Sequence, residues 1–243
     1  MSNTFRPEKG KKGFAVLVDP DKQNDQSVSY LAELLNNYTP DVILVGGSLL
    51  FNPVEPVISN FKQHLNCPVY LFPGDVSQVS ARADGILLLS LISGRNPDFL
   101  IGNHVIAAPS IRRSGMDIIP TGYILIENGH LTSVEYVSNT RPIPFGKIDL
   151  AVATAMAGEM LGMKQIYLEA GSGAAKPVGI DMIKEISENI NLPLVVGGGI
   201  RTSEEAENVY RAGADVIVIG NRFEEFPDQV ADFITLRDRL NSE

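Results

Sequence analysis

Short runs of aliphatic residues recur along the chain, and most of them end in glycine or in an acidic residue. The run at 14–18 leads into Asp19-Pro20-Asp21-Lys22, and the run at 41–45 leads into Gly46-Gly47-Ser48. Runs without a polar interruption are typical of strands that are buried on both faces, as in parallel sheets. We read eight such strands, at 14–18, 41–45, 68–72, 85–93, 117–127, 165–169, 193–197 and 216–220.

Segments with apolar residues at helical spacing separate these strands. The first, at 27–37, carries Val28, Leu31 and Leu35, and further helices are expected at 53–64, 98–108, 148–161, 180–189, 203–212 and 224–241. Eight strands that alternate with helices within 243 residues predict an α/β fold of the (β/α)8 TIM-barrel type, with residues 1–243 as one domain. An open, doubly wound sheet is the alternative.

Two connections depart from the regular alternation. Residues 76–83, after the third strand, are too few for a confident helix, so we expect the third outer helix to be reduced or missing. Asn128-Gly129 favours a tight turn between antiparallel strands, and 131–137 alternates like an exposed return strand. We therefore expect a small hairpin insertion after strand five, at 128–146.

Charge and composition exclude several classes of partner. The net charge of −9 argues against general binding to nucleic acid or to anionic membrane surfaces. The longest apolar run, around 86–92, is well short of the ~20 residues of a membrane-spanning helix, so we expect no stable membrane insertion and a cytoplasmic location. The single cysteine, Cys67, excludes an intrachain disulfide.

Glycine clusters follow three consecutive strands near the end of the chain. They are Gly171-Ser172-Gly173, Gly197-Gly198-Gly199 and Gly220-Asn221. In a (β/α)8 barrel the loops after strands seven and eight often bind phosphate, because glycine lets backbone N–H groups surround an anion. Tight strand-to-helix turns are the alternative reading, but the recurrence favours a phosphate site.

Carboxylates stand at two other strand ends. Asp19 and Asp21 follow strand one and Ser48 follows strand two, an oxygen-rich set that suits Mg²⁺ together with substrate phosphates. A solvated turn explains Asp-Pro-Asp equally well. Glu169 ends strand six beside the glycine clusters, where it can accept a proton from a substrate hydroxyl or only hydrogen-bond a ligand.

These motifs together resemble the geranylgeranylglyceryl phosphate synthase family, which includes the bacterial heptaprenylglyceryl phosphate synthases. The matching segments run in order along essentially the whole chain: DPDK at 19–22, GGS at 46–48, YLEAGSG at 167–173, GGGI at 197–200 and GN at 220–221. The AGSG ending and the SNTRPIP loop at 138–144 look most like the second of the family's two sequence groups. Leu17 departs from the lysine of the heptaprenyl members, which puts a transfer of their substrate preference in doubt.

The resemblance implies a prenyltransferase of ether phospholipid biosynthesis. A polyprenyl group, in our interpretation geranylgeranyl, would pass from its diphosphate to the sn-3 hydroxyl of sn-glycerol 1-phosphate with release of diphosphate. The resemblance assigns Mg²⁺ to Asp19 and Ser48, and we interpret Glu169 as the catalytic base. The residues implied for sn-glycerol 1-phosphate are Tyr167, Leu168, Glu169, Ala170, Gly171, Ser172, Gly173, Gly198, Gly199, Gly220 and Asn221.

A long prenyl tail needs an apolar groove, and a thin outer layer after strand three would make room for one. The candidates are Leu89, Leu91, Ile92, Phe99, Tyr123 and Ile124, with barrel core as the alternative. The alanine- and methionine-rich helix at 148–161 indicates either a subunit contact or barrel packing, and the family implies a homo-oligomer, dimer or hexamer. Rival functions are another phosphate-binding barrel enzyme, an isomerase or a lyase, and a non-catalytic phosphate-binding barrel.

Overall fold

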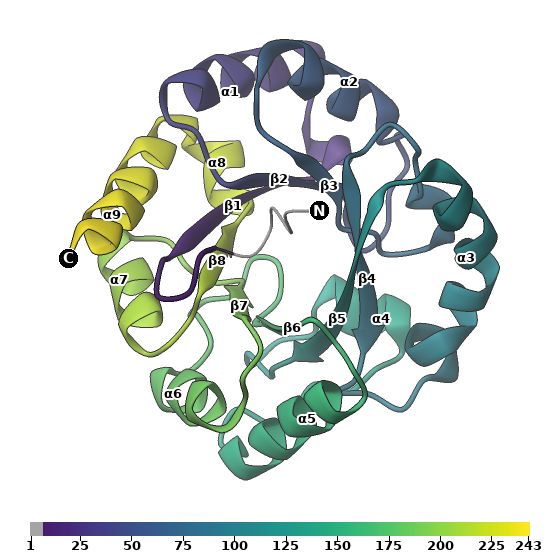
Figure 1. Ribbon diagram of the computed structural model, residues 1–243, viewed down its shortest axis with the longest axis vertical. Coiled ribbons are helices and arrows are strands. Elements are labelled where there is room, and N and C mark those ends of the chain that lie inside the picture. The colour runs from purple at the N-terminus through teal and green to yellow at the C-terminus, as the bar shows by residue number, and fades with distance from the viewer. Residues whose placement is uncertain (1–6) are drawn as a thin grey trace.

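Eight parallel strands close into a barrel in the computed structural model, which describes residues 7–243. The strands follow one another in chain order, and β1 pairs with both β2 and β8 (Figure 1). They are β1 Gly13–Val18, β2 Val42–Val45, β3 Val69–Leu71, β4 Gly85–Leu91, β5 Asp117–Leu125, β6 Gln165–Glu169, β7 Leu194–Gly197 and β8 Val216–Ile219. The predicted barrel is confirmed, and the pairing of β1 with β8 excludes the open sheet.

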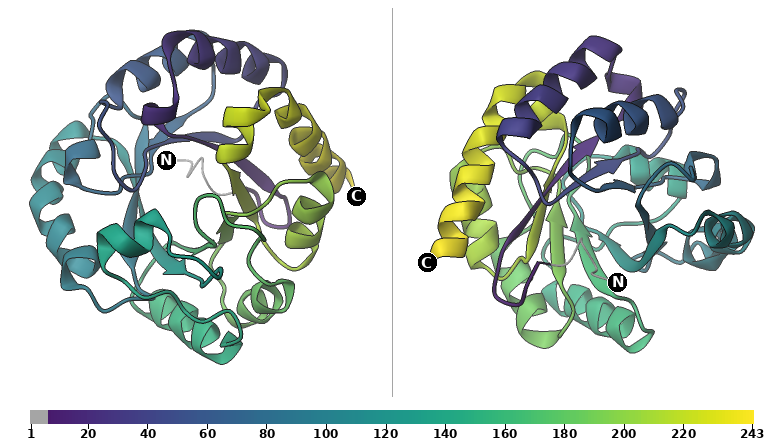
Figure 2. Two further views of the ribbon diagram at one scale, coloured as in Figure 1. Left: turned by 180° about the vertical axis from the view of Figure 1, so that it is seen from behind. Right: turned by 45° about the horizontal axis from the view of Figure 1, so that its top comes forward.

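A ring of helices surrounds the barrel, as the front view in Figure 1 and the view from behind in Figure 2 show. The helices are α1 Asp25–Asn37, α2 Glu55–His64, α3 Asn103–Ser114, α4 Ser133–Ser138, α5 Ile148–Met160, α6 Ile180–Asn189, α7 Ser203–Arg211, α8 Asn221–Glu225 and α9 Val230–Ser242. Local sequence fixes several starts: Thr202 and Glu205 form a capping box on α7. The helix predicted at 224–241 is interrupted before Pro227, and its main part is α9.

The connection from β3 to β4 contains a single 3-10 turn, Val76–Gln78, and no α-helix among the described residues. The buried Gln78 side chain holds this turn against the barrel, because its amide donates to the Gly47 carbonyl over 2.8 Å and accepts from the Gly74 amide over 3.0 Å. The outer layer is therefore thin beside β3 and β4. α3, preceded by a π-helical turn at Asp98–Gly102, is the next helix along the chain.

The predicted hairpin after strand five is wrong. Residues 133–138 form the short helix α4, whose start is capped by the Thr132 hydroxyl accepting from the Glu135 amide. Leu131, Val134 and Val137 are spaced by three residues, so their pattern suits a helix, and the apparent alternation was misleading. The insertion touches the sheet only through an isolated parallel bridge between Ile126 and Ile143.

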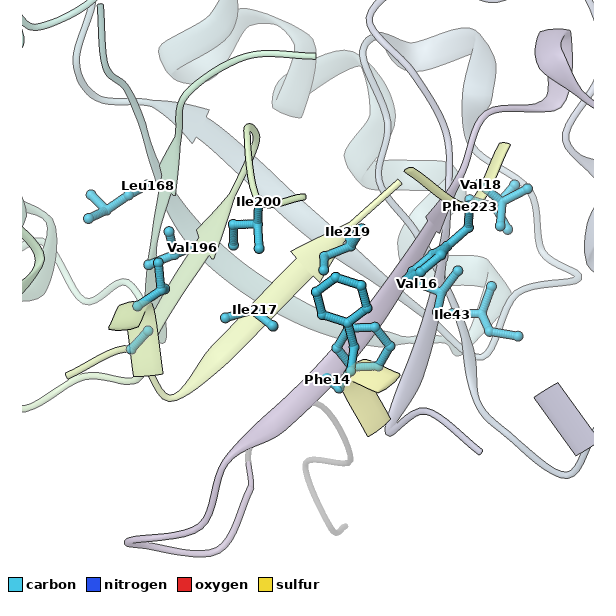
Figure 3. Close-up of a cluster of buried hydrophobic side chains, with 14 of the residues drawn as sticks. Phe14, Val16, Val18, Ile43, Leu168, Val196, Ile200, Ile217, Ile219 and Phe223 are labelled. Atoms are coloured by element: carbon cyan, nitrogen blue, oxygen red, sulfur yellow. The ribbon is translucent and has the colours of Figure 1, made fainter. Parts of the chain in front are cut away.

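Apolar side chains fill two layers. One lies between the strands and the helices, and Figure 3 shows part of it, with Phe14, Val16 and Ile217 from β1 and β8 packed near Phe223. The other lies inside the barrel and includes Leu44, Leu87 and Val195. Because the lumen is filled by side chains, space for a ligand is left at the carboxyl ends of the strands, as is usual for this fold.

No helix among residues 7–243 combines the length and the apolar character needed to cross a bilayer.

Candidate active site

A cavity of about 610 Å³ opens at the carboxyl ends of the strands, and we call it the mouth cavity. Most of the predicted polar site residues line it together, although they come from segments up to 200 residues apart in the chain. From the predicted set, the lining comprises Asp19, Ser48, Tyr123, Tyr167, Glu169, Gly171, Ser172, Gly173, Gly198, Gly199, Gly220 and Asn221. The closed barrel thus brings the metal candidates and the glycine clusters to one site.

The glycine loops have backbone conformations that other residues rarely adopt. Gly171, Gly173, Gly198 and Gly199 all have φ between 73° and 99°, in the left-handed region. A Cβ on Gly198 would also overlap the carboxylate of Glu169. These glycines therefore allow the loops after β6 and β7 to approach one another closely.

The loop after β6 is also joined to the end of β8. The Ser172 hydroxyl donates to Oδ1 of Asn221 over 3.1 Å. Asn221 is the first residue of α8, directly after Gly220. The loops after three strands thus line one part of the mouth cavity with glycines, an arrangement that suits an oxyanion.

Two residues of the predicted glycerol-phosphate set lie outside the cavity lining. Leu168 and Ala170 are buried in the layer between strands and helices, and Figure 3 shows the Leu168 side chain in that layer near Val196. The alternation of a strand explains this, because Tyr167 and Glu169 point inward and their neighbours point outward.

Glu169 is the buried carboxylate of the mouth cavity. It is 7% exposed, and its Oε1 accepts from the Gly171 amide over 2.7 Å. Burial raises the pKa of Glu169 to about 7, and the Gly171 amide and the hydroxyls of Tyr167 and Tyr123 partly offset the rise. A carboxylate with this pKa can exchange a proton near neutral pH.

Tyr123 and Tyr167 stand beside this carboxylate, and the ring of Phe72 packs against both of them. Tyr123 and Tyr167 are stacked with ring centroids 5.2 Å apart, and Phe72 is tilted against them at 6.0 and 5.4 Å. The Tyr167 hydroxyl is fully buried and close enough to Glu169 to lower the pKa of that carboxyl, although it forms no hydrogen bond of ordinary geometry with the described residues. We call these residues the aromatic trio. The sequence reasoning missed Phe72, because one aromatic residue after a short apolar strand looks like ordinary core.

Asp19 and Ser48 lie side by side at the ends of β1 and β2. The Oδ2 atom of Asp19 faces Gly47, where an added Cβ would be 3.4 Å away, and Ser48 is the next residue. Burial raises the pKa of Asp19, and its ion pair with Lys22 is long, at 3.9 Å. Oδ1 accepts from the Asp21 amide over 3.0 Å, so Oδ2, which has only the distant Lys22, is the oxygen that suits a cation.

Both carboxylate oxygens of Asp21, in contrast, accept hydrogen bonds from the loop at 51–52. Its carboxylate accepts from the amides of Phe51 and Asn52 at 2.8 and 2.7 Å and from the Asn52 side chain at 2.9 Å. These bonds lower the pKa of Asp21 and occupy both of its oxygens. The residue pattern does not separate the two aspartates and only the family resemblance selects Asp19, whereas the structure leaves Asp19 as the better metal candidate.

A narrower cavity of about 80 Å³ adjoins the mouth cavity and extends over the thin outer layer beside β4 and α3; we call it the groove. Of the six predicted groove residues, four line it, Leu89, Leu91, Phe99 and Tyr123, whereas Ile92 and Ile124 do not. The remaining walls are mainly apolar and include Val76, Val79, Ile86, Leu88, Ala107, Ile111, Val134 and Val137.

His104 is one of the polar residues that line the groove, and Ser90 lies behind it. His104 Nε2 is 3.3 Å from the hydroxyl of Ser90, and burial lowers the pKa of the imidazole. A neutral histidine is compatible with an apolar ligand.

Charged residues at the rim of the mouth cavity also escaped the sequence reasoning. Lys22 pairs with Glu224 over 3.2 Å, and both line the cavity with Arg201. Arg201 donates to the carbonyl of Ala174 over 3.0 Å, which fixes the end of the loop after β6. Their separation in the sequence hides this grouping, although Lys22 belongs to the DPDK motif.

Fold and cavity together define a (β/α)8 barrel of the enzyme type, with a polar site at the carboxyl ends of its strands and an apolar groove beside it. The profile of the PcrB family matches residues 6–236, and the chain belongs to this family.

Curated relatives and a solved structure support this assignment. The chain is 50% identical to the geranylgeranylglyceryl phosphate synthase of Chitinophaga pinensis, over 92% of this chain and 90% of the relative. It is 48% identical to that of Spirosoma linguale, over 96% and 94%. It also resembles the crystal structure of (S)-3-O-geranylgeranylglyceryl phosphate synthase from Thermoplasma acidophilum in complex with its substrate sn-glycerol-1-phosphate. That match has a TM-score of 0.88 and 30% identity, over 96% of this chain and 94% of the other.

Proposed function

We propose that the chain is a geranylgeranylglyceryl phosphate synthase, which transfers a geranylgeranyl group to the sn-3 hydroxyl of sn-glycerol 1-phosphate in ether phospholipid biosynthesis. The observation that carries this proposal is the 50% identity to a synthase of this name over nine tenths of both chains. The groove that opens from the mouth cavity supports it, because a long apolar tail and a polar phosphate need adjoining sites.

The glycerol phosphate would bind in the mouth cavity. We propose that its phosphate lies between the loops after β6, β7 and β8, where Gly173, Gly198, Gly199 and the start of α8 offer backbone amides. The Gly171 amide donates to Glu169 instead. The net charge of −9 makes such a local site necessary for an anionic substrate. The crystal structure of the Thermoplasma acidophilum enzyme in complex with this substrate supports the choice.

A Mg²⁺ ion would be held by Asp19 and Ser48 beside the diphosphate of the second substrate. The fit rests on the poorly compensated Asp19 carboxylate next to Ser48, and on the preference of Mg²⁺ for few protein ligands plus phosphate oxygens and water. When bound, Mg²⁺ would neutralise charge on the diphosphate and make it a better leaving group.

The transfer step breaks one C–O bond, forms another and needs one base to accept a proton. The C–O bond between the allylic carbon and the diphosphate breaks, and its electron pair leaves with the diphosphate. The sn-3 oxygen of glycerol phosphate forms the new C–O bond, and its proton passes to the carboxylate of Glu169. The phosphate loops orient this hydroxyl, because they fix the other end of the same small molecule.

The tail of the prenyl diphosphate would lie in the groove, along Leu89, Leu91, Phe99 and Tyr123. We further propose a homo-oligomer. α5 is apolar around most of its circumference, and Leu150 and Met160 are exposed on it, so a second copy is a natural partner for this face. The cytoplasmic location stays a prediction.

The test is incubation of the full chain with sn-glycerol 1-phosphate, Mg²⁺ and geranylgeranyl diphosphate, with release of diphosphate and formation of the ether product measured together. Both are expected in the wild type, and Asp19→Ala should reduce them at least a hundredfold. A barrel that binds glycerol phosphate without releasing diphosphate would be the non-catalytic rival. Turnover of a sugar phosphate without any prenyl diphosphate would indicate an isomerase or lyase.

A further inference from the structure

The mouth cavity and the groove share five lining residues. They are Gly47, Ser48, Phe72, Tyr123 and Val134. If the tail occupies the groove and the glycerol phosphate occupies the mouth cavity, as the proposed function requires, the carbon that changes partners lies where the two cavities meet. Two of the five residues at that junction, Phe72 and Tyr123, are aromatic.

The junction offers the allylic carbon π faces. The aromatic trio is buried, with Phe72 9%, Tyr123 4% and Tyr167 fully covered. Tyr123 and Tyr167 are stacked at 27°, so each covers one face of the other. Phe72 is tilted at 58° and 45° to them, so neither of these rings lies parallel to its face.

The aromatic trio can stabilise positive charge that no nearby carboxylate among residues 7–243 is free to stabilise. As the C–O bond to the diphosphate lengthens, positive charge develops on the allylic carbon. Glu169, the buried carboxylate of this region, is engaged by the Gly171 amide and has the proton of the hydroxyl to accept. An aromatic face attracts a cation and is a much weaker nucleophile toward it than a carboxylate oxygen.

We propose that Phe72, with Tyr123 beside it, is a catalytic residue that stabilises this developing positive charge through a cation–π interaction and keeps water from the carbon. The proposal rests on the proposed function, since it requires a prenyl diphosphate at the junction. A desolvated cation–π contact of this kind changes a rate by about thirtyfold.

The test weakens the π face without changing its shape much. Mono-, di- and trifluorophenylalanine are placed in turn at position 72 of the full chain. The single-turnover rate is measured with geranylgeranyl diphosphate, sn-glycerol 1-phosphate and Mg²⁺. The rate should fall in steps with each fluorine, to about one tenth for the trifluoro variant. Affinity for sn-glycerol 1-phosphate should stay unchanged.

The same fluorinated series at Phe233 is the matched control. Phe233 is buried in the outer layer and packs on Phe14 and Phe223, remote from the junction lining. Its series should leave the rate unchanged. A second pair of variants separates the ring from its bulk: Phe72→Tyr should keep most of the rate, whereas Phe72→Leu should lose at least as much as the trifluoro variant.

The outcomes separate this inference from the function on which it rests. A flat fluorine series at position 72, or a Phe72→Leu variant as fast as the wild type, would overturn the role of Phe72 and leave the synthase activity standing. A wild-type chain that transfers no prenyl group would overturn the proposed function itself.

Discussion

The side chain of Glu169 points inward at the carboxyl end of β6 and is almost completely removed from water. Its pKa of about 7 follows first from this burial, and the Gly171 amide prevents a larger rise. About half of the molecules therefore carry an ionised Glu169 near neutral pH. This suits a group that must take up a proton and then give it to solvent.

The first prediction concerns this residue. Glu169→Gln should lower kcat about a hundredfold or more and change the affinity for sn-glycerol 1-phosphate little, because the amide keeps the shape but accepts no proton. In the wild type only the ionised form is active, so kcat should rise with pH through about 7 and level off above it. Measurement of kcat between about pH 5.5 and 8.5 checks both points. An unchanged kcat in the glutamine variant would disprove the base assignment.

At this scale the sequence predicts best where the residue type is itself constrained. Gly171, Gly173, Gly198 and Gly199 were predictable because left-handed backbone leaves glycine as the usual choice. Asp19 and Asp21 were not separable by residue pattern, without the family resemblance, because the loop at 51–52 that engages Asp21 lies 30 residues away in the chain. Phe72 was hidden for the same reason, since its neighbours Tyr123 and Tyr167 come from other strands.

Among the elements, the connections after β3 and β5 shape the site more than the helices do. The tight turn at Val76–Gln78 keeps the outer layer thin beside the groove, and the sequence indicated this through the shortness of 76–83. The connection after β5 misled the sequence reasoning, because Asn128-Gly129 is a strong hairpin signal by itself. In the structure Asn128 instead serves the loop after β6.

The second prediction concerns this Asn128 contact. Its side-chain amide donates to the carbonyls of Lys176 and Ala170 over 2.9 and 3.3 Å and so fixes the loop after β6. Asn128→Ala should raise the KM for sn-glycerol 1-phosphate about tenfold, as expected from the loss of one to two hydrogen bonds, with a much smaller change in kcat. Asn189→Ala is the matched control, because Asn189 makes a similar bond to the Glu185 carbonyl on the exposed surface of α6. Equal KM values in the two variants would contradict a positioning role.

In the whole molecule, the closed barrel places two chemically different cavities, the mouth cavity and the groove, next to each other. Residues of β1, β2 and the last three strands form the polar mouth cavity, and the region of β4 and α3 forms the apolar groove. The sequence predicted the barrel from its alternating segments. It did not show that the two spaces meet at Ser48, Phe72 and Tyr123, because this depends on the closure of the barrel and on side-chain packing.

The geometry of α3 allows the length of the groove to be tested. This helix runs back along the barrel from the carboxyl ends of the strands, so Asn103, Ala107 and Ile111 lie at successive turns along the groove. A large side chain at the small central position would divide the groove and leave space for a short prenyl chain only. The part of the groove next to the mouth cavity, near Tyr123 and Phe99, would stay open.

Ala107→Phe should therefore lower kcat/KM for geranylgeranyl diphosphate about tenfold or more, while a prenyl diphosphate of half that length is used as well as by the wild type. Val105→Phe is the matched control, since Val105 is 66% exposed on the same helix and a ring there does not enter the groove. Steady-state kinetics with prenyl diphosphates of graded length provide the measurement, and thermal unfolding of both variants shows whether the added ring costs stability. If Ala107→Phe lowers activity equally for all lengths, the tail does not lie along α3, and the groove has another role.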